Sequence, residues 1–474
     1  MGDTTSTPAS GTSGLSVRSS DACLIAARLD RIPPNAFHGR LAGLLAGGTF
    51  FDAFDAVSIA VGLTVIKGYF KIGFSEAGLI VSAGYLGQLV GAFFVGALAE
   101  KAGRRRAFII SLVVFGGVSI AAALSWSATS LLVFRMVQGL GLGAEVPLAA
   151  TLMNEFLDSR HRGRIGLLYQ SAFAWGILIA PLAGVLLIGK LDHEAGWRWL
   201  FAVGALPLLM AVAAWRWLPE SPRWLAEHGR ITEADAIVSN VEKAAARRGT
   251  VLPEPEATSP QHAGRLRLAE LFSAAYRRRT VMLWVSWFAT FFVTYGFNVW
   301  LPTLYVTLGG LAPSASLGLT VISSAVQVIG VYAGAFLIDR IGRKPLLVAG
   351  FALMAAGTGF GTIGVSVLQL TAWPVLFAAG LVIAAGVSLP ATILYVYTAE
   401  LYPTRMRAWG SSAASGFNRS ASVISPIVIS QVLAAGGGVS LVFGIMLIAA
   451  VLGLVVLAGM GIETRNRTLE ELAR

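Results

Sequence analysis

Long apolar runs restrict this sequence more than any other feature. Stretches of about 20 predominantly apolar residues, long enough to cross a bilayer as a helix, recur along the chain. Hydrophobic residues make up 55% of the 474 positions and charged residues only 13%, a composition of multi-pass membrane proteins. We therefore expect an all-α integral membrane protein with twelve transmembrane helices near residues 41–66, 76–98, 107–126, 130–155, 164–188, 197–217, 280–306, 316–338, 345–367, 373–398, 408–434 and 437–461.

Basic residues indicate how the chain is oriented. Of the 36 Lys and Arg residues, only four fall in one set of alternate loops and two inside predicted spans. By the positive-inside rule, both termini and the central loop are expected to be cytoplasmic, in a plasma membrane of the bacterial inner-membrane type. The net charge of +11 then reflects anionic lipid rather than nucleic acid. The single cysteine, Cys23, excludes an internal disulfide bond.

Polar stretches divide the chain into five parts. Residues 1–22 are rich in Ser, Thr and Gly and are expected to lack ordered structure, whereas Leu24–Arg40 predicts a short amphipathic surface helix. The predicted parts are a cytoplasmic segment 1–40, a six-helix bundle 41–217, a cytoplasmic central loop 218–279, a second six-helix bundle 280–461 and a cytoplasmic tail 462–474.

The two halves contain related signatures. The stretch Gly96–Arg105 follows the second span, and the similar stretch Ala335–Lys344 follows the eighth. Charged signatures beginning at Glu155 and at Glu400 close spans four and ten. A six-span unit used twice in parallel orientation predicts a secondary transporter with two bundles and a binding site between them near the membrane midplane.

These signatures resemble those of the major facilitator superfamily along essentially the whole chain. The stretches Pro219–Leu225, Glu400–Arg407 and Glu463–Leu472 resemble the branch of sugar porters and metabolite:proton symporters, and Arg31–His38 with the Asp52/Asp55 pair is most similar to niacin-type and aromatic-acid proton symporters. The resemblance implies two six-helix bundles with pseudo-two-fold symmetry and transport by alternating access, with the proton as coupling ion and no other cofactor.

Departures from the hexose porters argue against a hexose substrate. Phe292-Val293 occupies the place of the Gln-Gln pair that hexose porters carry before Gly296-Phe-Asn298. The tryptophan of the tenth span is missing from Gly386–Pro390, and both losses remove groups that bind hydroxyls. Gln170 matches the sugar-porter position, so a sugar substrate is kept as an alternative.

Two carboxylates, Asp52 and Asp55, interrupt the first span. Together they cost roughly 5–7 kcal/mol at a helix centre, and their i, i+3 spacing places both on one helix face. We interpret them as proton-binding groups, with Arg135 of the fourth span as their counter-charge, a role that the family resemblance also implies. The alternative is a static ion pair between spans one and four. For Glu145 three interpretations are open: a second proton site, a partner of a basic residue, or a substrate contact.

Arg419 lies near the middle of the eleventh span and has no acid near it in its own helix. Its planar guanidinium suits a carboxylate ligand, and the resemblance to aromatic-acid and organic-anion carriers implies the same role, so we interpret Arg419 as an anion anchor. The alternative is an ion pair with Glu145 or Asp52. Further substrate-site candidates, each open to the alternative of ordinary packing, are Tyr295, Asn298, Gln170, Trp175 and Asn418, followed by Thr294, Tyr85, Gln88 and Gln327.

Charged residues at the predicted cytoplasmic helix ends form a separate group. Such residues can build ion-pair networks that break as the bundles rock, although topology retention is an alternative role. The predicted gate consists of Glu100, Arg104, Arg105, Glu155 and Arg162 in the first half and Asp339, Arg340, Arg343, Glu400 and Arg407 in the second.

We predict a proton-coupled symporter of a small organic anion, an aromatic or heteroaromatic carboxylate. Alternatives are a sugar or polyol symporter, a proton-antiporting exporter and a non-transporting receptor on a carrier scaffold. The sequence contains no His-Glu-x-x-His, Cys/His or P-loop motif, so neither an enzyme nor a metal site is expected. The expected partners are a small-molecule substrate, protons and membrane lipid, and the protein is expected to be a monomer.

Overall fold

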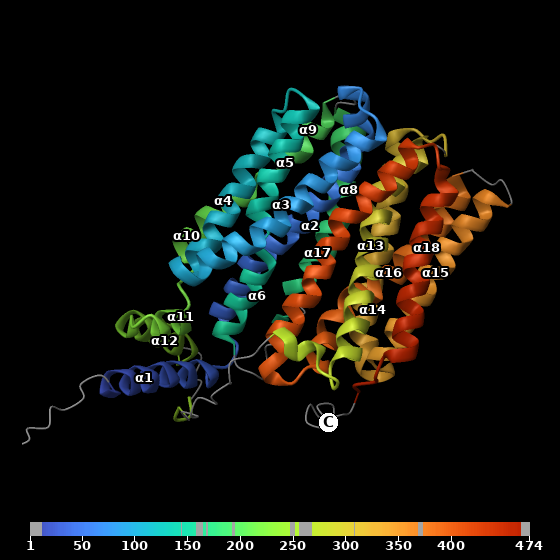
Figure 1. Ribbon diagram of the computed structural model, residues 1–474. Helices are drawn as coiled ribbons and strands as arrows, with labels where there is room; N and C mark the ends of the chain where they lie inside the picture. Colours follow the sequence, from blue (N-terminus) through green and yellow to red (C-terminus); the bar gives the residue numbers. More distant parts are fainter. Residues whose placement is uncertain are drawn as a thin grey trace, which may run out of the picture.

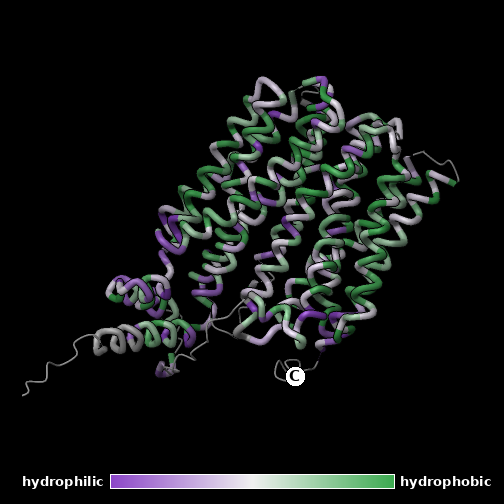
Figure 2. Tube along the Cα trace, viewed as in Figure 1, coloured by the Kyte–Doolittle hydropathy of each residue, from purple (hydrophilic) through white to green (hydrophobic). Residues whose placement is uncertain are grey.

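The computed structural model is helical in all of its regular elements and forms two bundles that lie side by side (Figure 1). Hydrophobic residues cover most of both bundles, and hydrophilic residues concentrate at the end that carries helices α11 and α12 (Figure 2). The structure describes residues 12–143, 145–157, 165–166, 169–191, 195–246, 252–255, 268–307, 309–367 and 373–465.

The first bundle contains the helices between residues 36 and 217. Helices α5 and α6 together make its fourth span, and α9 and α10 its sixth. Pro181 lies inside α8, which continues into the π-helical turn η1. The elements are α2 (Ala36–Phe70), α3 (Phe74–Ala102), α4 (Arg104–Ala123), α5 (Ala128–Leu142), α6 (Glu145–Phe156), α8 (Ala172–Leu186), η1 (Leu187–Leu191), α9 (Gly196–Val203) and α10 (Pro207–Trp217).

The second bundle contains six long helices, α13 to α18. Among the described residues of the whole chain, eleven helical segments are long and apolar enough to cross a membrane. The predicted span 408–434 corresponds to α17, which has the necessary length but is more polar because it carries Asn418 and Arg419. The six helices are α13 (Arg277–Thr307), α14 (Pro313–Ile341), α15 (Arg343–Ser366), α16 (Trp373–Leu401), α17 (Thr404–Ala434) and α18 (Gly438–Met460).

The N-terminal region differs from the prediction. Helix α1 (Thr12–Asp30) begins inside the stretch that was expected to lack order. The predicted helix Leu24–Arg40 is interrupted at Pro33-Pro34, because proline removes a backbone donor and disfavours a helical residue before it. Helix α2 then starts at Ala36, where the side chain of Asn35 accepts a hydrogen bond from the Phe37 amide.

Helix α1 packs against two short helices of the central stretch, α11 (Pro222–Glu227) and α12 (Ile231–Ala246). Arg28 and Arg31 both donate to the Glu242 carboxylate, at 2.7 and 2.6 Å. Partial burial raises the pKa of Glu242, but these two hydrogen bonds outweigh it and hold the pKa below its usual value. The α1–α12 contact is therefore ionic as well as apolar.

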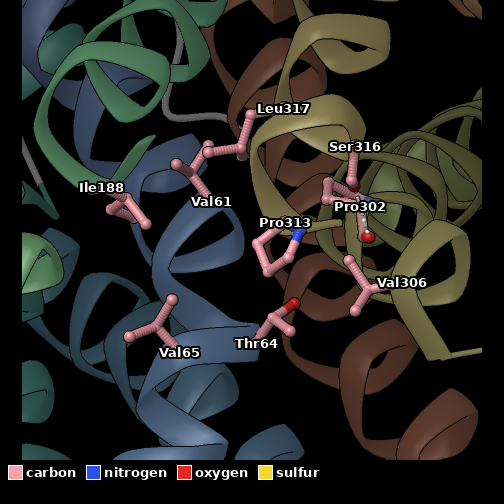
Figure 3. A pocket seen from close by; sticks show the side chains of 9 residues that line it. All are labelled: Val61, Thr64, Val65, Ile188, Pro302, Val306, Pro313, Ser316 and Leu317. Carbon is pink, nitrogen blue, oxygen red and sulfur yellow. Dashed lines mark hydrogen bonds between the residues drawn. The ribbon is translucent and has the colours of Figure 1, made fainter. Parts of the chain in front are cut away.

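The bundles meet mainly through α3 with α17, α8 with α14, and α2 with α13. Contacts between them are close at the end opposite α11. There Ser75 accepts from Gln431 at 2.8 Å, and the hydroxyls of Thr64 and Thr303 lie 3.4 Å apart. Side chains of α2, η1, α13 and α14, including Leu317, enclose a space of only about 10 Å³ at this contact (Figure 3). Side chains of the two bundles thus pack against each other at this end.

Candidate functional site

The acids of α2 are buried on one face of the helix, as their spacing predicted. Arg135 Nη1 lies 2.7 Å from each carboxylate oxygen of Asp55. Gln138, one turn after Arg135, donates to Asp55 Oδ1 at 3.0 Å and accepts from Arg135 Nη1 at 2.6 Å. Gln138 also donates to the Ser119 hydroxyl at 2.6 Å, so the cluster joins α2, α4 and α5.

Glycine makes room for this buried cluster. A Cβ atom on Gly84 of α3 would lie 2.8 Å from Arg135 Nη2, and one on Gly139 would lie 2.1 Å from the Gly84 carbonyl oxygen. Small residues let the backbones of α3 and α5 approach each other closely, which brings the guanidinium to α2. The glycine pattern of the fourth span therefore serves the position of Arg135.

A second network runs from Asp52 to the other bundle. The side-chain amide of Gln88 in α3 donates to Asp52 Oδ1 at 3.1 Å, and its oxygen accepts from Arg419 Nη1 at 2.6 Å. Arg419 Nη2 donates to the Gly143 carbonyl oxygen, at the end of α5, at 3.1 Å. Both ends of the guanidinium fork are therefore bound to neutral oxygens of the first bundle. Within the described part of the chain, Arg419 forms no ion pair with Glu145 or Asp52.

Glu145 is the unpartnered acid of the site. It is 1% exposed, and neither carboxylate oxygen has a hydrogen-bond partner among the described residues. A Cβ atom on Gly48 of α2 would lie 2.0 Å from Glu145 Oε1, so the carboxylate rests directly on the first span. Asp52 and Arg419 are near enough to act on it electrostatically. Among the described residues, the structure thus brings Glu145 close to Asp52 and Arg419 without giving it a hydrogen-bonded basic partner.

The other predicted substrate residues lie around these networks. Tyr295 contacts Tyr85 at a ring-centroid distance of 4.8 Å, and Asn298 Oδ1 accepts from Gln327 at 3.0 Å. The Trp175 indole donates to the hydroxyl of Tyr332 in the opposite bundle at 3.0 Å. Asn418 lies close to Tyr395, Thr294 donates to the Thr290 carbonyl of its own helix, and Gln170 is half-buried beside the buried Tyr169.

The predicted gate residues form matching ion pairs in the two halves. Arg104 lies 3.6 Å from Glu155 and 3.3 Å from Glu100. In the second bundle Arg343 lies 2.9 Å from Glu400 and 3.0 Å from Asp339. The arginine that opens the helix after each tight turn thus contacts the acid that ends the fourth span of its bundle, as the internal repeat predicts.

Two acids that were not predicted complete these turns. Gly103 and Gly342 have φ of 104° and 108°, a region that favours glycine, and each directly precedes a helix. Glu220 accepts from the Arg105 amide at 2.9 Å, and Glu463 accepts from the amides of Arg343 and Lys344 at 3.0 and 2.9 Å. Burial raises the pKa of Glu463, but its backbone hydrogen bonds outweigh this and hold the pKa below its usual value.

Four gate candidates do not join the predicted pairs. The Arg105 side chain donates to the Trp215 carbonyl instead of an acid. Arg407 does not pair with Glu400, because Arg343 and Thr464 already bind that carboxylate. Arg340 is exposed and forms no ion pair among the described residues, and Arg162 lies outside them.

Several site residues were missed by sequence reasoning. Gln138 carried a usable signal, because it stands three residues after Arg135 on the same helix face. Ser119, Tyr332 and the Gly143 carbonyl carried none, since each reaches the site from another part of the fold.

Two six-helix bundles with paired charged turns define a transporter of the major facilitator class. The model of the family described as "Sugar (and other) transporter" matches residues 65–474, and the chain belongs to that family. The D-xylose–proton symporter crystal structure superposes with a TM-score of 0.71 at 19% identity, covering 90% of this chain and 98% of that one. The predicted fold class is confirmed, and the protein is a multi-pass membrane transporter of a small molecule rather than an enzyme.

Curated relatives carry more specific names. The niacin transporter NiaP of Acinetobacter baylyi is 32% identical over 450 residues, covering 94% of this chain and 99% of the relative. The 4-hydroxybenzoate transporter PcaK of Pseudomonas putida is 30% identical over 414 residues, covering 86% and 88%. The resemblance to niacin-type and aromatic-acid transporters is therefore confirmed at the level of sequence similarity.

The buried Asp55–Arg135 pair leads to a prediction about stability. Arg135→Gln leaves the Asp55 carboxylate buried without its cation, and we expect the free energy of unfolding to fall by about 3–5 kcal/mol. The double variant Asp55→Asn/Arg135→Gln is expected to recover part of this loss. Thermal unfolding of the purified protein in detergent measures both effects.

The matched control is Arg230→Gln, which breaks the exposed Arg230–Glu233 pair. We expect this change to leave the melting temperature nearly unchanged, because an exposed ion pair contributes little to stability. Equal melting temperatures for Arg135→Gln and Arg230→Gln would contradict the prediction that the stability of the protein depends on the buried pair.

Proposed function

We propose that this protein is a proton-coupled symporter of a small organic anion, an aromatic or heteroaromatic carboxylate. The observation that carries the proposal is the fork of Arg419, whose two nitrogens bind two neutral oxygens of the opposite bundle, from Gln88 and Gly143. A carboxylate offers two oxygens to the same fork and forms stronger, charge-assisted hydrogen bonds. An incoming anion can therefore replace both acceptors.

The relatives support the choice of substrate class. Transporters named for niacin, 4-hydroxybenzoate and gallate, all of them aromatic carboxylates, are similar to this chain over most of its length. Tyr295, which is close enough to Arg419 to interact with it electrostatically, offers an aromatic ring for such a substrate. Phe292-Val293, in place of hydroxyl-binding glutamines, gives no comparable support for a sugar.

Proton coupling follows from the charges around Arg419. Three acids, Asp52, Asp55 and Glu145, share two bases, and Arg135 forms its ion pair with Asp55. Arg419 is the base that acts electrostatically on Asp52 and Glu145. An anion bound to Arg419 neutralises that charge and favours the protonated form of either acid. Anion binding and proton binding therefore assist each other, which is the requirement for symport.

Gln88 connects this exchange to the movement of the bundles. It bridges Asp52 in the first bundle and Arg419 in the second, so substrate binding at Arg419 breaks a bond between the bundles. The Arg104–Glu155 and Arg343–Glu400 pairs each lie within a single bundle. In the proposed gate they hold helix ends of the same bundle together. We place both termini and this gate on the cytoplasmic side of a bacterial inner membrane.

Uptake by the purified protein in proteoliposomes tests the anion anchor. We expect nicotinate or benzoate, but not xylose, to accumulate when the lumen is alkaline relative to the outside. Arg419→Ala is expected to reduce uptake at least about tenfold, and Arg419→Lys to restore it only in part because the bidentate fork is lost. Arg216→Ala, at the exposed end of α10, is the control. Unchanged nicotinate uptake in Arg419→Ala, or xylose accumulation, would refute the proposed substrate class.

Acid variants test the coupling separately. In Asp52→Asn and Asp55→Asn we expect accumulation driven by the pH gradient to be lost, while exchange of labelled for unlabelled substrate continues in at least one of them. With one proton per monoanion, the pH gradient supplies about 1.4 kcal/mol of free energy per pH unit. This free energy sets the maximum accumulation of substrate to be measured. Gradient-driven accumulation at the unmodified level in both variants would rule out these acids as coupling groups.

The bridging role of Gln88 makes a further prediction. Gln88→Leu removes one competitor for Arg419, so we expect nicotinate to bind about 3–10-fold more tightly, the effect of one hydrogen bond. Isothermal titration calorimetry in detergent measures this affinity. Gln431→Leu removes another glutamine that bridges the bundles, at Ser75, and is expected to leave the affinity unchanged. Weaker binding in Gln88→Leu would instead identify Gln88 as a direct substrate contact.

A further inference from the structure

An apolar groove of about 410 Å³ lies outside the proposed transport site, between α13, α17 and α18. Trp284 and Phe417 stack at a ring-centroid distance of 4.5 Å in its wall, and Phe288 stacks on Phe292 at 5.7 Å. On α18 it is bordered by Ile448 and Leu452, which are 69% and 52% exposed. Helix α18 packs chiefly against α13 and α15 of its own bundle, so this groove faces the surrounding lipid.

The length of the groove corresponds to one leaflet of a bilayer. Its lining on α13 runs from Val281 to Phe292, which is about 16 Å of helix. Half of a hydrocarbon core of about 30 Å is about 15 Å. The groove therefore has the length and the apolar character to hold a single acyl chain from its interfacial end to near the midplane.

Positive charge marks the interfacial end. Helix α13 begins with Arg277 and Arg278, both exposed and one turn before Val281. Arg278 Nη2 donates to the Gly459 carbonyl at 2.9 Å and so spans the mouth between α13 and α18. The Arg277 side chain forms no hydrogen bond or ion pair among the described residues. Arginine at this depth attracts the phosphate of an anionic lipid headgroup.

We propose that this groove binds one anionic phospholipid, with an acyl chain along α13 and the headgroup phosphate at Arg277 and Arg278. Phe417 lies in the groove wall two residues before Arg419, so the bound chain contacts the helix that carries the proposed anion anchor. The lipid site itself does not depend on the identity of the transported substrate.

Native mass spectrometry of the full-length protein, delipidated and then exposed to equal amounts of phosphatidylglycerol and phosphatidylcholine, tests the site. We expect one phosphatidylglycerol to be retained in preference to phosphatidylcholine. Arg277→Ala/Arg278→Ala is expected to lower phosphatidylglycerol retention about 30-fold, the effect of two interfacial arginines, and to lower phosphatidylcholine retention less, because the choline group balances its phosphate charge. Arg277→Ala alone keeps the Arg278–Gly459 bond and is expected to give a smaller loss of the same kind. Arg216→Ala is the control.

Filling the groove tests the acyl-chain slot independently. Ala449→Trp places a large ring in the groove, whereas Val455→Trp places the same ring on an exposed part of α18. We expect only Ala449→Trp to abolish retention, and Ala449→Leu to reduce it. Equal retention of both lipids by the unmodified protein, undiminished phosphatidylglycerol retention in Arg277→Ala/Arg278→Ala, or equal effects of the two tryptophans would overturn the proposal.

Discussion

The buried contact between Asp55 and Arg135 determines much of the first bundle. Neither charge can remain in an apolar interior without the other, because an unpaired buried charge costs several kcal/mol. Gln138 contacts both members of the pair and itself donates to Ser119, and Gly84 and Gly139 let the helices approach closely around the guanidinium. This requirement binds α2, α4 and α5 into one unit.

Arg419 has a different kind of partner. Its bonds to Gln88 and Gly143 cross between the bundles and involve no opposite charge. Neutral acceptors hold a guanidinium less strongly than a carboxylate does, which is why the proposed substrate anion is placed at Arg419 and not at the Asp55–Arg135 pair. The ion pair of Arg135 is therefore interpreted as structural, and the neutral contacts of Arg419 as the place of the proposed substrate binding. Glu145 and Asp52 lie beside the exchangeable contact and are the acids that its charge affects.

The two halves repeat their chemistry as well as their helices. A glycine with positive φ precedes each arginine that opens a helix, and a glutamate from the end of the same bundle binds the backbone amides at that turn. The arginine side chain then reaches the acid at the end of the fourth span of its bundle. The same local geometry in both halves shows that these residues stabilise each bundle from within.

The sequence by itself determined the class of fold, because apolar runs of transmembrane length and a repeated charged turn permit few alternatives in lipid. It also indicated Asp52, Asp55, Arg135 and Arg419, since charges inside such runs are conspicuous. Only the tertiary structure decided their partners. Gln88, Gly143 and Ser119 are ordinary polar groups in sequence, and the approach of α3, α5 and α4 to α2 and α17 gives them their contacts. The pairing of Glu400 with Arg343 instead of Arg407 was likewise decided by helix packing, which local spacing does not encode.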